Sequence, residues 1–316
     1  MTTPRPLDSR AIGLMLVLCA IWGLQQVVLK ATAADITPIW QIGLRSAVAA
    51  VLVGLVMWVR GERMRLSDGI WRAGLVVGLL FGVEFLLVAE GLRHTSASHM
   101  VVFLYTAPMF AALGLHWRLH AERLGPLQWL GVALAFGGIA MTFLGRGAAV
   151  PAAGSDAAQI LWGDFLGLMG GIAWGATTVV VRSSNLARAS ASQTLLYQLL
   201  GAAILLCSVA GFTGQTTVHW SPTVVASLAF HALVVSFASF LVWFWLLGRY
   251  YASRLGVFSF LTPLFGVVFG AWFLSEPLEP GFVVGAVPVL LGIVLVSGGG
   301  GWVGQQLSAW RHRKPS

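Results

Sequence analysis

One acidic side chain stands in the middle of a long apolar run. Glu84 lies within residues 81–86 (Phe-Gly-Val-Glu-Phe-Leu), and the residues three and four positions after it are apolar, so no base pairs with it on the next helical turn. A carboxylate inside a membrane is costly and marks a functional site by default. We therefore expect Glu84 to bind a cationic substrate group, a proton, or both. A structural ion pair with Arg45 or Lys30 is the alternative.

Polar and aromatic side chains in neighbouring apolar runs complete the candidate site. Gln25 and Gln26 follow one Trp-Gly pair, and Thr177 and Thr178 follow a second. A buried amide without a hydrogen-bond partner is costly, so these side chains are expected to face other helices or water. The candidate substrate-binding residues are Trp22, Gln25, Gln26, Glu84, Tyr105, Trp174, Thr178, Ser239 and Trp243. Packing between helices is the alternative role for the aromatic members.

The remaining polar residues are expected to have structural roles. Three bases near the ends of apolar runs have side chains long enough to reach the membrane interface and form structural or gating pairs, namely Lys30, Arg45 and Arg182. Three acids in the joints between runs are expected to be solvated, namely Glu122, Glu276 and Glu279. His99 is interpreted as a packing residue, with a titratable switch as the alternative.

No pattern in the chain predicts catalysis or a bound cofactor. Cys19 and Cys207 sit in apolar runs without ligand spacing, so they predict neither a metal site nor a disulfide. The motifs H-E-x-x-H and G-x-S-x-G do not occur, and without a G-x-x-x-x-G-K-[ST] run ATP-driven pumping by this chain alone is not expected. An enzyme would need a converging set of acids, bases or ligands, and only one clear acid stands within an apolar run.

The composition indicates that lipid surrounds these apolar runs. Of 316 residues, 58% are hydrophobic and 9% are charged, and the mean hydropathy is +0.84. Soluble domains have roughly a quarter charged residues, because their surfaces must contact water. The formal net charge of +8 does not predict a nucleic-acid partner, since the basic residues fall between apolar runs and form no patch on a soluble face.

The apolar runs predict ten membrane-spanning helices. A bilayer needs about 20 apolar residues per helix. Ten stretches meet this approximately: 11–30, 38–59, 71–91, 97–117, 125–144, 160–181, 192–211, 222–247, 255–275 and 280–300. The first resembles a secretion signal, but the recurrence of its motif in the sixth favours a structural helix. The fold class expected is therefore all-α integral membrane.

The basic residues predict the orientation of these helices. If the N-terminus is cytoplasmic, 15 of the 19 lysine and arginine residues fall in segments on the cytoplasmic side. Ten spans then place both termini in the cytoplasm of a bacterial-type cell with the helices in the inner membrane. The basic run 311–314 is interpreted as an anchor at the anionic membrane surface.

The chain also repeats itself at a separation near 154 residues. Trp22-Gly23 matches Trp174-Gly175, and segments 95–110 and 250–265 are identical at six of 16 positions. Gly131 and Gly138 match Gly285 and Gly292 at the same separation. An odd number of helices per copy would place the second copy in the opposite orientation, as in the inverted repeats of secondary transporters. We therefore predict two five-helix repeats, residues 1–150 and 151–316, joined by a linker from Arg146 to Asp164.

In these residues the chain resembles the EamA type of the drug/metabolite transporter superfamily. The resemblance covers nearly the whole chain, and the residues that carry it are Trp22-Gly23, Lys30, Arg45, Thr95–Ser98, Pro108, Glu122–Leu124 and Gly131, then Ala252-Ser253, Thr262–Leu264 and Glu276–Leu278. It implies a ten-helix carrier, and many members export amino acids, other metabolites or toxic compounds. These motifs are fairly specific for the superfamily and do not name a substrate.

The function expected is secondary transport of a small metabolite by alternating access. The resemblance favours export of amino acids or related compounds, and uptake of a vitamin or nucleobase-like compound is the alternative. A membrane-embedded enzyme and a structural subunit are weaker candidates. The partners expected are a small-molecule substrate, membrane lipid, and protons or a counter-ion for coupling, while the oligomeric state is left open.

Overall fold

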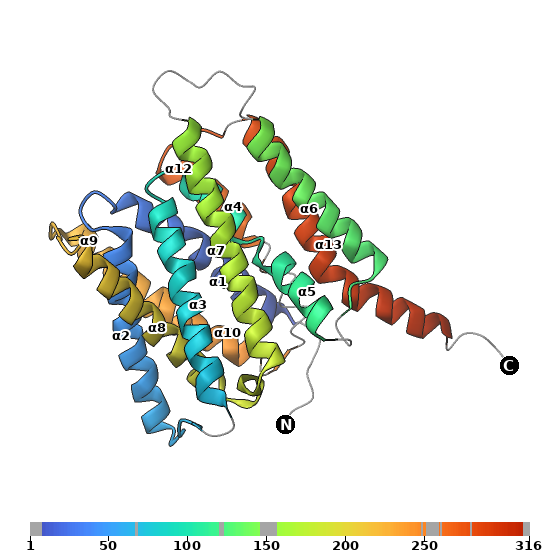
Figure 1. Ribbon diagram of the computed structural model, residues 1–316, viewed down its shortest axis with the longest axis horizontal. Coiled ribbons are helices and arrows are strands. Elements are labelled where there is room, and N and C mark those ends of the chain that lie inside the picture. Colours follow the sequence, from blue (N-terminus) through green and yellow to red (C-terminus); the bar gives the residue numbers. More distant parts are fainter. Residues whose placement is uncertain are drawn as a thin grey trace.

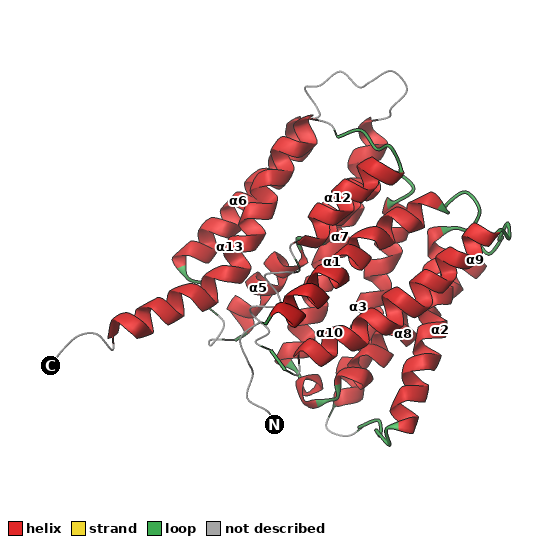
Figure 2. Cartoon of the chain, turned by 180° about the vertical axis from the view of Figure 1, so that it is seen from behind, coloured by secondary structure: helices red, strands yellow, loops and turns green. Residues whose placement is uncertain are grey.

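The computed structural model describes residues 8–66, 69–119, 123–145, 157–247, 249–250, 259, 261–278 and 280–311. These residues are almost entirely helical (Figure 2), and they include an isolated β-bridge between Ile36 and Val218. The helices are α1 (Ser9–Ala31), α2 (Pro38–Val59), α3 (Ile70–Gly91), α4 (Ala97–Leu104), α5 (Ala107–Arg118), α6 (Pro126–Gly145), α7 (Ala157–Ser183), η3 (Asn185–Arg188), α8 (Ala191–Phe212), α9 (Pro222–Ala229), η4 (Phe230–Ser239), α10 (Phe240–Leu247), α12 (Leu261–Phe273) and α13 (Pro280–Arg311).

The described residues confirm the all-helical fold class. Seven described helical segments are long and apolar enough to cross a membrane: Ser9–Ala31, Pro38–Val59, Ile70–Gly91, Ala97–Arg118, Ala157–Ser183, Ala191–Phe212 and Pro222–Trp243. The other three predicted runs contain shorter apolar helical stretches, at Pro126–Met141, Leu261–Phe273 and Pro280–Leu295. Each predicted run therefore contains a helix, and the count of ten spans stays a prediction.

Short polar side chains mark where several helices begin. Thr37, Ser96, Ser190 and Ser221 each accept a hydrogen bond from a backbone N–H in the first turn of α2, α4, α8 and α9. Such caps satisfy backbone donors that would otherwise lack a partner, which matters most at the edge of a bilayer. Asp8 caps α1 in the same way.

Two of the predicted spans are irregular. The fourth is divided into α4 and α5 by Tyr105 and Thr106, directly before Pro108, whose ring cannot join a continuous helix. The Thr106 hydroxyl donates to the carbonyl of Phe103 at the break. The eighth contains η4, a ten-residue π-helix between α9 and α10. π-Helical turns are rare and are found frequently at functional sites.

Helices α6 and α13 form a pair at one side of the main bundle (Figure 1). Glycines bring their backbones together: a Cβ atom at Gly138 would lie 2.5 Å from the carbonyl oxygen of Gly285, and one at Gly292 would overlap the carbonyl oxygen of Gly131. Small residues allow such close approach between helices in lipid. The four glycines are those that match between the two halves of the sequence.

The Trp-Gly motifs also make the same contact twice. A Cβ atom at Gly23 in α1 would meet Gly266 N, Phe265 Cβ and Thr262 O in α12. At Gly175 in α7 it would meet the corresponding atoms of Ala111, Phe110 and Ala107 in α5. The aligned segments of the sequence therefore occupy corresponding places in the fold.

The segment between α6 and α7 is shorter than the predicted linker, which ran from Arg146 to Asp164. Helix α7 begins at Ala157, so Asp164 lies in its third turn and is fully buried. The prediction that Asp164 ends a linker is therefore wrong, because its carboxylate is paired within the bundle. Residues 146–156, most of the basic run 311–314, and Glu122 and Glu279 lie outside the described residues.

Candidate functional site

A basic and an acidic side chain are buried among the long helices. Arg45 of α2 and Glu84 of α3 are each 3% exposed. The guanidinium of Arg45 donates from Nη1 to Gln25 Oε1 at 3.1 Å, and its carbon lies 4.6 Å from the centroid of the Phe85 ring. The expectation that Arg45 reaches the membrane interface is therefore wrong: an amide and an aromatic ring hold it inside the bundle.

Polar atoms of both side chains have no hydrogen-bond partner. Among the described residues this holds for Glu84 Oε2 and Arg45 Nε, and it also holds for both amide atoms of Gln26, the neighbour of Gln25 in α1. Arg45 and Glu84 are close enough for their charges to interact, yet none of the described ion pairs joins them. Buried polar groups are normally satisfied, so this cluster is costly unless another molecule completes it.

A second polar network holds one wall of this cluster. His231, in the π-helix η4, places its ring nitrogens 3.1 Å from the backbone oxygen of Gln25 and 2.8 Å from that of Ser227. Gln41 of α2 donates to the Ser227 hydroxyl and lies 3.2 Å from the same imidazole. The network ties α1, α2 and η4 together where Gln25 contacts Arg45.

The aromatic candidates form two contacts. The Trp22 indole N–H donates to Ser239 Oγ at 2.9 Å, and the ring packs edge-on against Trp243 with centroids 5.6 Å apart. Tyr105 packs edge-on against Trp174 at 5.1 Å. Tyr105 also interacts electrostatically with Glu84, which places this second contact near the buried charges.

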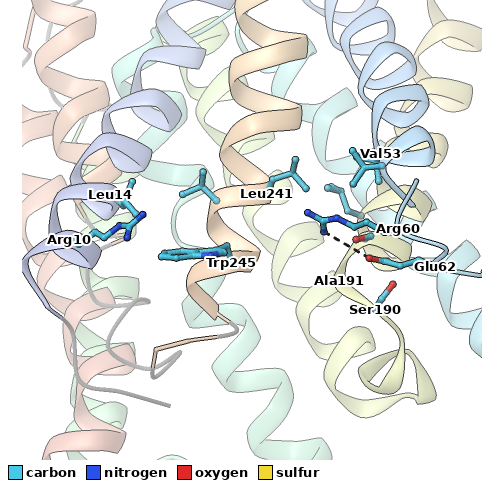
Figure 3. A pocket seen from close by; sticks show the side chains of 13 residues that line it. Arg10, Leu14, Val53, Arg60, Glu62, Ser190, Ala191, Leu241 and Trp245 are labelled. Atoms are coloured by element: carbon cyan, nitrogen blue, oxygen red, sulfur yellow. Dashed lines mark ion pairs between the residues drawn. The ribbon is translucent and has the colours of Figure 1, made fainter. Parts of the chain in front are cut away.

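A cavity of about 590 Å³ opens at one end of the bundle. Figure 3 shows Arg10 and Leu14 of α1 on one side, Leu241 and Trp245 of α10 beside them, and Arg60 and Glu62 after α2 on the other side. Leu14, Val242 and Trp245 of its lining belong to the hydrophobic cluster that contains Trp22 and Trp243. The cavity therefore lies against the aromatic part of the candidate site.

The family of this chain follows from its similarity to known proteins. The model of the EamA-like transporter family matches residues 9–144 and, a second time, residues 161–298. This chain belongs to the EamA-like transporter family. Both matches together cover most of the chain, and the repeated match agrees with the internal similarity found in the sequence.

Several relatives of this EamA-like transporter have names that refer to transport. "Uncharacterized transporter YoaV" of Bacillus subtilis is 24% identical over 87% of this chain and 92% of its own length. "Probable amino-acid metabolite efflux pump" of Salmonella typhimurium is 25% identical over 91% of this chain and 95% of its own length. One solved crystal structure has the same fold, with a TM-score of 0.62 and 19% identity over 92% of this chain and 96% of that one.

The EamA-like fold brings most of the predicted site residues into two groups. Gln25, Gln26, Glu84 and Tyr105 are all buried; Gln25 contacts Arg45, and Tyr105, with Trp174 packed on it, interacts with Glu84. A second group comprises Trp22, Ser239 and Trp243, and its two tryptophans share a hydrophobic cluster with Leu14, Val242 and Trp245 of the cavity lining. Thr178 is half-buried and donates to the carbonyl of Trp174 within its own helix, so its position supports a structural role more than a binding role.

Sequence reasoning missed three residues of this EamA-like transporter that the structure makes prominent. Arg45 is central to the buried cluster, and its position well inside the predicted span 38–59 was the available signal. Asp164 is a second acid inside a span, paired with His99 at 3.0 Å. Glu276 is not simply solvated: its carboxylate accepts hydrogen bonds from the backbone N–H groups of Ala97 and Ser98 at 2.7 and 3.0 Å.

Proposed function

We propose that this protein is a secondary transporter that exports a small zwitterionic metabolite, such as an amino acid, by alternating access. The observation that carries the proposal is the pair of buried, opposite and incompletely satisfied charges on Arg45 and Glu84. The efflux relative supports export and the amino-acid class. We assign the transport role to two five-helix units, residues 1–150 and 151–316.

The chemistry of the cluster fits a zwitterion. A guanidinium recognises a carboxylate through two parallel N–H donors, and a carboxylate such as that of Glu84 accepts from an ammonium group. An amino acid has both groups on one carbon, so it can satisfy Arg45 and Glu84 together. The amide of Gln26 supplies a further donor and acceptor for the polar part of the substrate.

The cavity provides the entry route in this proposal. Its lining comes from the start of α1, the end of α2, the start of α8 and the end of α10, where basic residues such as Arg10 and Arg60 gather. Basic residues accumulate on the cytoplasmic side of membrane proteins. In this proposal the cavity opens to the cytoplasm, and both termini lie on that side of the membrane.

The proposal predicts selective stabilisation of the purified protein by amino acids. At about one hundred times its dissociation constant, a ligand that binds only the native state adds about 2.7 kcal/mol of stability, which raises the melting temperature by about 5 °C. We expect such a rise with at least one of the common amino acids, measured by a thermal-shift assay in detergent. The matching amino-acid amide, which lacks the carboxylate, and the N-acetyl derivative, which lacks the ammonium, should give no rise.

A pair of matched variants tests whether Arg45 binds the carboxylate of the substrate. Arg45→Gln should lose the response to the amino acid, whereas Arg93→Gln, which changes an exposed arginine, should keep it. Equal stabilisation by the amino acid, its amide and its N-acetyl derivative would contradict recognition of a zwitterion.

A further inference from the structure

Three elements lie next to one another from the cavity to the opposite end of the bundle. They are α1, α2 and the span that consists of α9, η4 and α10. Each of them contributes to the cavity lining, for example through Leu14 of α1, Val53 of α2 and Leu241 of α10 (Figure 3). Polar contacts between the three elements follow one another along α1, and these contacts define a track through the protein.

The first contacts beyond the cavity include residues of the candidate site. Trp22 of α1 donates to Ser239 of η4. Nearly one turn further along α1, the side chain of Gln25 accepts from Arg45 of α2, and its backbone oxygen contacts the imidazole of His231 in η4. Arg45 therefore lies beside this track, between the cavity and the contacts that follow.

A layer of uncharged polar groups follows on the side of Arg45 away from the cavity. Gln41, one turn before Arg45 in α2, donates to the hydroxyl of Ser227 in α9. The Thr32 hydroxyl, just after α1, lies 3.0 Å from Gln41 Oε1 and 3.4 Å from Ser227 Oγ. Thr32, Gln41 and Ser227 are each at most 4% exposed. We refer to these three residues as the outer network, because it separates Arg45 from the solution at this end.

Two joints between helices meet next to the outer network. Ile36, between α1 and α2, forms the isolated bridge with Val218, which lies between α8 and α9. The Thr37 hydroxyl donates to a backbone oxygen of the second joint at 2.8 Å, and a backbone N–H of that joint donates to the Asp35 carbonyl at 2.9 Å. These contacts, which we call the clasp, join residues 1–150 to residues 151–316 at the end of the track.

The clasp can separate more easily than the glycine contacts between long helices. A Cβ atom at Gly201 of α8 would overlap the backbone of Gly78 in α3, so these helices pack backbone against backbone. The clasp consists of hydrogen bonds between two joints, and each such bond adds little net stability because water replaces the lost partner. The π-helix η4 directly follows α9, and helices bend at π-turns. Helix α9 can therefore move away from α1 and α2 while α3 and α8 stay packed.

We propose that the α1–α2 and α8–α9 joints form the outer gate of the transporter, and that the exported substrate leaves through the outer network and the clasp. This proposal rests on the proposed export by alternating access. When the gate is closed, Thr32, Gln41 and Ser227 satisfy one another's hydrogen bonds. When α9 moves away, the same hydroxyl and amide groups can bind the polar groups of the passing substrate or water. Neither state then leaves them buried without a partner.

A disulfide across the clasp tests the gate. Ile36→Cys and Val218→Cys are combined in a background with Cys19→Ala and Cys207→Ala, which removes both cysteines of the chain. Residues directly opposite each other in an antiparallel pairing have Cα atoms about 4.5–5.5 Å apart, a separation that a disulfide can bridge. We expect oxidation to lower amino-acid counterflow in proteoliposomes at least about tenfold, because the closed form is held, and a reductant to restore it. Each single-cysteine variant should keep its flux after the same oxidation.

The accessibility of position 227 tests the gate without any substrate. Ser227→Cys is added to the double-cysteine variant, and right-side-out vesicles are treated with a membrane-impermeant maleimide. Modification of position 227 is measured by mass spectrometry of its peptide, with and without the disulfide. Ser227 is 4% exposed, so its replacement should react when the gate opens, and the disulfide should lower the rate at least about tenfold.

Two further positions in α8 and just beyond it serve as controls when they replace Ser227→Cys. Thr213→Cys, at an exposed site after α8, should react equally with and without the disulfide. Ala202→Cys, buried within α8, should stay unmodified in both samples, which confirms that the variants are folded.

Three outcomes would overturn the outer gate: failure of Ile36→Cys and Val218→Cys to cross-link, full flux through the cross-linked protein, or equal modification of Ser227→Cys with and without the disulfide. The last of these leaves amino-acid binding at Arg45 and Glu84 untouched. Conversely, a thermal-shift screen in which no amino acid binds would remove the proposed substrate, while protection of position 227 by the disulfide would still support the gate.

Discussion

Replacing Glu84 with glutamine is expected to lower the initial rate of transport at least about a hundredfold. The substitution keeps the shape of the side chain and removes the charge that balances Arg45 and accepts the substrate ammonium. Breaking a buried charge pair by removing one partner costs about 3–5 kcal/mol, and the same reasoning applies to Arg45→Gln. The measurement is counterflow of a radiolabelled amino-acid mixture in proteoliposomes that contain equal amounts of each variant.

The double variant separates binding from stability. Each single variant leaves one buried charge unbalanced, so each should melt at a lower temperature than the parent. Glu84→Gln combined with Arg45→Gln leaves no unbalanced charge and should recover most of the melting temperature, while transport stays absent. Glu90→Gln, at the exposed end of the same helix, serves as the control and should keep normal flux. Full transport by Glu84→Gln would remove this residue from the mechanism.

Replacing Gly201 with leucine is expected to prevent the protein from folding. Even a Cβ atom at this position of α8 would overlap the backbone of Gly78 in α3, and a backbone cannot move aside as a flexible side chain can. The two helices would have to separate along a contact that is equally close at Gly78, where an added Cβ atom would lie 2.6 Å from the backbone oxygen of Tyr197. Overpacking costs about 1–3 kcal/mol even where neighbours can adjust. The measurement is the yield of monodisperse protein after extraction in detergent.

Gly211 provides the matched control in the same helix. It is exposed, and a Cβ atom there would meet nothing within 4 Å, so Gly211→Leu should give the yield of the parent. A normal yield from Gly201→Leu would mean that α3 and α8 do not pack as closely as the structure places them.

Much of the helical framework could be predicted because lipid imposes simple rules on the sequence. A long apolar run must form a helix that satisfies its own backbone, so the runs at 11–30 and 38–59 lie within one or two residues of α1 and α2. The joint before α2 could be read from Thr37 and Pro38, which cap and begin that helix. The break between α4 and α5 follows from Pro108, although its exact place depends on Tyr105 and Thr106.

The partners of polar side chains could not be predicted in the same way. Arg45 and Gln25 are twenty residues apart, and Asp164 and Thr95 are 69 apart, so only the packing of whole helices brings them together. A basic side chain near the end of a span usually extends to the membrane interface. Arg45 does not, because its guanidinium contacts Gln25 and Phe85 inside the bundle. The π-helix at Phe230–Ser239 has no signal in its composition, since the extra residue per turn is stabilised by contacts such as that of His231 with Gln25.

The reciprocal glycine contacts bear on how such a chain could have arisen. Gly138 approaches Gly285 while Gly292 approaches Gly131, so each contact repeats the other with the two parts of the chain exchanged. Two separate copies of an ancestral half could make both contacts across a twofold axis, as a self-complementary dimer does. Gene fusion would then have fixed a pairing that already existed, and afterwards each copy could acquire its own residues, such as Glu84 in one and Ser239 in the other.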